Sequence, residues 1–153
     1  MKCLTESEVR TVRSIGQTFF PRGNPSGIDG IDAGVTEYVD SYLARLPVWE
    51  RTKVRALFAA IEFLPAAASF DKSRRFSNCA QEEREELLDA WESSSVHFRR
   101  MAVKALKSLM GLAYVSSGAV AEKLGMEGVD LGTPEEHLKE LAKVKVIDLG
   151  AAE

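Results

Sequence analysis

Apolar residues recur at helical spacing through most of the first 125 positions. A capping box over residues 5–8 opens the first predicted helix, whose apolar positions continue to Phe19 before Pro21 ends it. After a loop rich in glycine and proline over residues 21–32, Asp32 is the predicted N-cap of a second helix. Pro47 suits the first turn of a third, which Pro65 ends. The first 65 residues therefore predict three helices.

The second half of the chain continues the helical pattern. A connector is predicted over residues 66–80, followed by a helix with an acidic start. The longest helix is predicted from Ser95 to Val115, and a short one from Ser117 ends at Gly125. The apolar face predicted for the longest helix comprises Phe98, Met101, Ala102, Ala105, Leu106, Leu109, Leu112 and Ala113.

The fold class predicted from this pattern is all-α. The 153 residues are enough for one domain. We expect a compact bundle of about five to seven helices over residues 1–128 and a C-terminal extension over residues 129–153. Thr133 and Pro134 predict a last helix in the extension, and residues 144–149 predict an extended segment.

Charge is unevenly distributed. The net charge is −3, and residues 126–153 contain seven acids against three lysines, which is −4 and leaves +1 for residues 1–125. A nearly neutral body is a poor surface for nucleic acid. No apolar run approaches the ~18 residues of a membrane span. The N-terminus contains no export signal, so we expect a cytoplasmic chain with reduced thiols at Cys3 and Cys79.

Residues that could perform catalysis do not form a recognisable constellation. His97 and His137 lie forty residues apart, and neither they nor the cysteines have zinc-ligand spacing. No glycine-rich phosphate motif occurs. Asp29 and Asp32 are interpreted as a turn and a helix cap rather than a calcium loop. The pattern thus favours an interaction protein over an enzyme, with no cofactor bound by this chain.

Two groups of residues are candidates for binding a partner. Arg74, Arg75 and Phe76 form one group in the second connector, outside any periodic core, and this group could bind a partner's carboxylates or attach the connector to the acidic helix that follows. Arg100 and Lys104, with Lys107, form the polar side of the longest helix. A solvated helix face is the simpler interpretation of this second group.

Short motifs in a fixed order give the sequence a resemblance to the gluconate 2-dehydrogenase subunit 3 family. They extend from residue 4 to about residue 128. The motifs are Leu4-Thr5-x-x-Glu8, Phe20-Pro21, Asp32-Ala33-Gly34-Val35, Tyr38-Val39-Asp40, Arg75-Phe76-Ser77, Glu82-Glu83-Arg84-Glu85-x-Leu87-Leu88, Trp91, Tyr114 and Lys123 to Gly128.

The resemblance implies a small helical accessory subunit. Its partner would be a large flavoprotein of the glucose–methanol–choline type that binds FAD, and a cytochrome or other electron-acceptor subunit could join the two. Many members have a twin-arginine signal, which this sequence lacks, so export would depend on a signal-bearing partner. Ala80 also replaces the usual capping residue of the acidic helix, which should cost ~1 kcal/mol.

Two hypotheses follow. The first is a non-catalytic subunit that assists the assembly, stability or export of an FAD-dependent sugar or alcohol dehydrogenase. The second is a free-standing helical regulator that binds nucleic acid through Arg100, Lys104 and Lys107. The acidic balance counts against the second.

Overall fold

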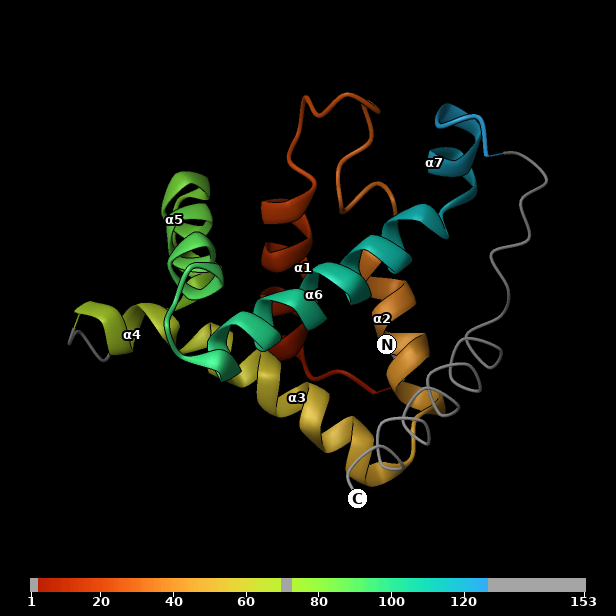
Figure 1. The fold of residues 1–153 in the computed structure, drawn as a ribbon. Coiled ribbons are helices and arrows are strands. Elements are labelled where there is room, and N and C mark those ends of the chain that lie inside the picture. Colours follow the sequence, from red (N-terminus) through yellow and green to blue (C-terminus); the bar gives the residue numbers. More distant parts are fainter. Residues whose placement is uncertain (1–2, 70–72, 127–153) are drawn as a thin grey trace, which may run out of the picture.

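The computed structural model describes residues 3–69 and 73–126, which fold as an assembly of helices (Figure 1). The predicted all-α class is confirmed, with seven α-helices, one 3-10 helix and no strand in these residues. The elements are α1 (Glu6–Phe19), α2 (Val35–Arg45), α3 (Val48–Glu62), α4 (Leu64–Ser69), η1 (Phe76–Asn78), α5 (Gln81–Glu92), α6 (His97–Val115) and α7 (Gly118–Lys123). The helix and extended segment predicted beyond residue 128 lie outside the described residues.

Helix α1 is the centre of the fold. It packs against α2, α3, η1, α5 and α6, and Figure 1 shows α6 crossing it. Its predicted capping box is present: the Glu8 amide donates to Thr5 Oγ1 at 3.4 Å, and the Thr5 amide donates to Glu8 Oε2 at 2.9 Å. Val12 and Ile15 of α1 are fully buried. Burial of each such side chain contributes about 1.5–3 kcal/mol.

The first connector is longer than predicted, and Asp32 is not the N-cap of α2. That position belongs to Gly34, which has a left-handed backbone with φ 72°. The reason lies in Asp29, whose carboxylate accepts the amides of Ile31 and Asp32, both at 2.9 Å. These hydrogen bonds form a further turn before Val35, where α2 begins.

The second predicted connector contains more structure than its composition indicates. Pro65 does not end the helical run as predicted; it lies in the first turn of α4, where a missing N–H leaves no bond unmade. Further along, η1 covers residues 76–78. Ala80 is the N-cap of α5 and provides no side-chain hydrogen bond, as the sequence predicted.

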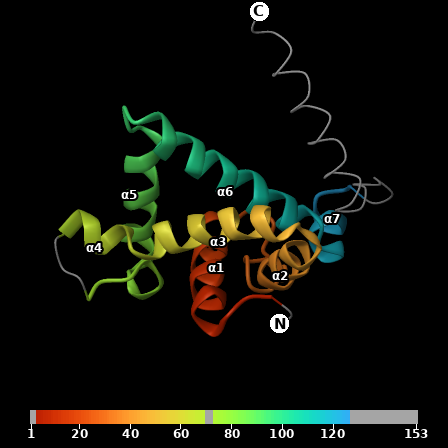
Figure 2. The same cartoon turned by 90° about the horizontal axis from the view of Figure 1, so that it is seen from below.

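Helix α6 begins at His97, and its buried face shares Ala102, Leu106 and Ala113 with the predicted face but is rotated from it. Figure 2 shows α5 and α6 meeting at a bend, with α6 continuing towards α7. The helices α2 and α5 pack on α6. The side chains that become buried are Ala102, Val103, Leu106, Met110, Ala113 and Tyr114. Phe98 and Met101, predicted to be buried, are 68% and 47% exposed because they lie beside this contact face.

A tyrosine near the end of α6 holds the first connector in place. The Tyr114 hydroxyl donates to the carbonyl of Ile28 at 2.6 Å and also hydrogen-bonds Ser26 Oγ. Its ring stacks on Phe20 with centroids 3.8 Å apart. Among the helices described, none is long and apolar enough to cross a membrane.

Candidate functional site

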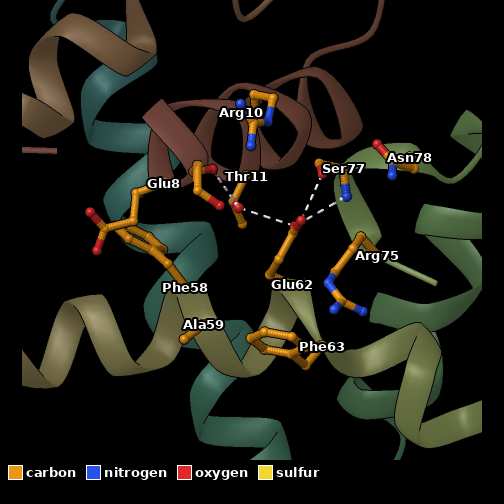
Figure 3. Close-up of a pocket in the computed structure, with 11 residues that line it drawn as sticks. Glu8, Arg10, Thr11, Phe58, Ala59, Glu62, Phe63, Arg75, Ser77 and Asn78 are labelled. Atoms are coloured by element: carbon orange, nitrogen blue, oxygen red, sulfur yellow. Dashed lines mark hydrogen bonds between the residues drawn. The ribbon is translucent and has the colours of Figure 1, made fainter. Parts of the chain in front are cut away.

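A shallow pocket of about 220 Å³ lies where α1, α3 and η1 meet (Figure 3). Phe58 at its base is fully buried, whereas Phe63 at its edge is 52% exposed. Two arginines, Arg10 of α1 and Arg75 from the second connector, also line it. The pocket thus combines an apolar base with two cations and the carboxylates of Glu8 and Glu62.

Glu62 lies inside this pocket and joins the three surrounding elements. Its Oε2 accepts the Thr11 hydroxyl at 3.0 Å and the Ser77 amide at 3.2 Å, and its Oε1 accepts the Ser77 hydroxyl at 2.7 Å (Figure 3). The residue is only 9% exposed. Since donors occupy both oxygens, the carboxylate acts as a structural joint between helices.

An ion pair lies beside this pocket, between α1 and α3. Glu8 receives two hydrogen bonds from Arg55, at 2.6 Å to Oε1 and 3.0 Å to Oε2. Partial burial raises the pKa of Glu8, but the bonds from Arg55 and Thr5 outweigh it, and its pKa lies below the ordinary value.

In the structure, the residues of the first predicted partner-binding group contact other parts of this chain. Arg74 forms an ion pair with Glu83 of α5, which is the attachment to the acidic helix that the sequence left as one alternative. Arg75 lies over the Phe63 ring at 4.5 Å. Phe76 is fully buried in the core, so the expectation that it lies outside the core is wrong. Partner binding by Arg74 and Arg75 stays a prediction.

The second predicted group lies on a different element. Arg100 donates to the carbonyls of Ser94 and Ser95, at 2.6 Å and 3.0 Å, and so closes the bend before α6. Lys107 pairs with Glu92 at 2.5 Å. Lys104 is exposed. Arg74 pairs with Glu83 near the start of α5, whereas Arg100 bonds Ser94 just after its end. The twelve-residue helix, about 18 Å long, therefore lies between the two predicted groups.

Exposed apolar side chains gather at the start of α6. We call Val96, Phe98 and Met101 the α6 apolar strip; they are 47%, 68% and 47% exposed. Side chains three residues apart on a helix are neighbours, so Phe98 and Met101 form a continuous surface. Sequence periodicity alone placed both in the core because it cannot tell which apolar side of a helix has a neighbour.

Several polar residues with structural roles were not singled out from the sequence. The carboxylate of Asp40, 3% exposed, accepts the amides of Cys3 and Leu4 at 2.9 Å and 2.8 Å and holds the N-terminal segment. Asp40 and Tyr114 both occur in the motifs of the family resemblance, which is the signal that could have identified them.

The cysteines are not joined in a disulfide, and the described residues contain no metal-ligating cluster. Cys3 and Cys79 are free thiols, and burial raises the pKa of Cys79. A thiol with a raised pKa is a poor nucleophile at neutral pH. No cluster of three or more metal-ligating side chains occurs within residues 3–69 and 73–126. His137 lies outside these ranges.

The described residues thus form a small helical fold. Its surface features are shallow pockets, the adjacent Arg74 and Arg75, and the α6 apolar strip. The chain belongs to the gluconate 2-dehydrogenase subunit 3 family, which it matches over residues 6–130. This membership confirms the resemblance seen in the sequence motifs and implies a subunit of a dehydrogenase complex. Comparison with curated proteins and with solved structures gives no match.

Proposed function

We propose that this chain is a non-catalytic subunit that binds a large FAD-dependent sugar or alcohol dehydrogenase and supports its assembly, stability or export. The observation that carries the proposal is the family match over residues 6–130. The partner is a flavoprotein of the glucose–methanol–choline type, and a cytochrome or similar acceptor completes the electron path. Co-export with a signal-bearing partner belongs to the same proposal.

Two features of the described residues support a partner-binding role for this chain. Four of their pockets measure about 200 to 280 Å³, so each of these four is smaller than the ~300–1,000 Å³ typical of small-molecule and cofactor sites. The α6 apolar strip offers the partly exposed apolar surface that protein contacts use. The basic side of α6 is partly occupied by internal contacts of Arg100 and Lys107, which makes nucleic acid the weaker alternative.

Co-expression tests the proposal directly. The tagged chain is produced together with a dehydrogenase of the glucose–methanol–choline type, purified, and examined by size exclusion and absorption spectroscopy. We expect a stoichiometric two-chain complex with a flavin spectrum, and a colourless, inactive chain when it is purified alone. A flavin bound by the isolated chain, or a dehydrogenase that never co-elutes with it, would contradict the proposal.

A further inference from the structure

Arg84 is a buried cation with no ion-pair partner among the residues that the structure describes. The residue follows the first turn of α5 and is 9% exposed. One guanidinium nitrogen, Nη2, donates to Gln81 Oε1 at 2.9 Å, but the buried Nε–H has no hydrogen-bond partner in the described part of the chain. The ion pairs of the same residues do not include Arg84.

This arrangement is unfavourable for an isolated subunit. Burying a guanidinium without a paired carboxylate loses hydration, and the Coulomb attraction of the neighbouring Glu85 does not offset that loss. Burial lowers the pKa of Arg84, yet an arginine side chain stays protonated at neutral pH. A retained buried charge with an unused donor points to an anion that comes from outside these residues.

The surroundings of Arg84 form an open pocket of about 280 Å³. Pro21, Arg22 and Asp29 of the first connector line one part of it, with Gln17 and Gln81 also in its wall. Arg22 and Asp29 pair at 3.0 Å and neutralise each other. Of the charged groups that line the pocket, Arg84 is the one without a paired counter-charge, and a single positive charge suits one carboxylate better than a phosphate dianion.

We propose that the Arg84 pocket receives one carboxylate side chain from the catalytic dehydrogenase subunit. The proposal rests on the proposed function, because that subunit supplies the carboxylate. Docking would give the buried guanidinium the counter-charge that it lacks. The contact lies between the first connector and α5, next to the connector in which Arg74 and Arg75 were predicted to bind a partner.

A titration of the isolated chain tests the pocket without any partner. The ¹⁵N-labelled chain is titrated with sodium acetate, against sodium chloride at equal ionic strength, while the Nε–H resonance of Arg84 is followed. We expect a saturable shift with half-saturation on the order of 10 mM acetate, the weak affinity of a single contact. Absence of a saturable shift, or saturation by inorganic phosphate but not by acetate, overturns the proposal.

Substitution of Arg84 tests the partner contact. Arg84→Met keeps the side-chain volume and removes the charge, so the isolated chain should unfold at an unchanged or higher temperature. Its dissociation constant for the dehydrogenase should rise at least about tenfold. Arg13→Met, at an exposed position on α1, is the control and should bind like the wild type. Equal binding by Arg84→Met, or a clear loss of its thermal stability, overturns the proposal.

Further variants distinguish a partner's carboxylate from a folding defect and from a counter-charge within this chain. If Arg84→Met fails to fold, Arg84→Lys keeps the charge without the planar fork and must still weaken assembly at unchanged stability. If acetate binds more tightly after Asp71→Asn or deletion of residues 130–153, the counter-charge comes from this chain and the proposal fails. A wild-type chain that never assembles with the dehydrogenase disproves the proposed function, whatever acetate does.

Discussion

At Gly30 the first connector lies close against the backbone of α1. A Cβ atom placed there would lie 2.5 Å from the carbonyl oxygen of Gly16 and 2.7 Å from its carbon. Both atoms belong to the backbone of α1 and cannot move aside without shifting the helix. The connector therefore depends on a missing side chain as much as on the contacts of Tyr114.

We expect Gly30→Ala to lower the free energy of unfolding by about 1–3 kcal/mol, because the added methyl overpacks against α1. Urea denaturation followed by circular dichroism measures this. Gly111→Ala is the matched control: its Cβ meets nothing within 4 Å inside α6, and it should stabilise by about 0.5–1 kcal/mol. A neutral Gly30→Ala would mean that the connector can move away from α1.

Among the elements, η1 combines a buried anchor with a neighbouring exposed cation. Phe76 is fully buried, whereas Arg75 is partly exposed over Phe63. We expect Phe76→Ala to lower the free energy of unfolding by about 3–5 kcal/mol. Arg75→Ala should change it by less than about 1 kcal/mol, since cation–π contacts at exposed sites are weak. Thermal denaturation of the two single variants measures this difference. If both variants lost the same stability, the assignment of Phe76 as the anchor would be wrong.

For the α6 apolar strip we expect the opposite of Phe76: substitution should leave stability nearly unchanged and weaken binding to the dehydrogenase. Phe98→Gln with Met101→Gln alters exposed side chains, so the free energy of unfolding should stay within about 0.5 kcal/mol of the wild type for each substitution. Assembly with the dehydrogenase should weaken about tenfold, corresponding to about 1.4 kcal/mol, as titration calorimetry would measure. Leu124→Gln, at an exposed position after α7, is the control. Unchanged assembly would show that the strip is not part of the interface.

The sequence predicts which segments form helices, but it does not predict which side of each helix packs against a neighbour. The capping box and the apolar period identified α1, because both signals are local. Asp32 is not the N-cap of α2 because the turn that Asp29 stabilises continues to Gly34, and this arrangement depends on the folded loop. The exposure of Phe98 and the burial of Arg84 depend on which helices pack beside them. Contacts between distant segments leave no periodic signal in a single sequence.

For the whole molecule, two acids with lowered pKa values, Asp29 and Glu8, contribute to the response to low pH. The Asp32 amide lowers the pKa of Asp29 from its ordinary 3.8, assisted by Arg22 and the Ile31 amide against the effect of burial. The pKa of Glu8 also lies below its ordinary 4.5. The unfolded chain therefore binds protons more readily than the folded chain as the pH falls through these values.

We expect both acids to contribute stability that is fully present above their ordinary pKa values and is lost as the pH falls through the lower, folded-state values. Chemical denaturation from about pH 6 to about pH 3 measures the slope. Asp29→Asn with Glu8→Gln should start less stable at pH 6 and lose less on acidification. A double variant as acid-sensitive as the wild type would assign the pH response to other groups.

The attachment of Tyr114 to Ser26 and Ile28 has a consequence for biosynthesis. Its hydroxyl bonds a carbonyl 86 residues earlier in the chain, and α6 packs on both α1 and α2. While the ribosome is still making α5, the apolar side of α1 has no cover from α6 and the first connector has no tyrosine to hold it. The chain thus completes its core only when synthesis is nearly finished, and premature termination before α6 leaves a nascent fragment that chaperones and proteases will treat as unfolded.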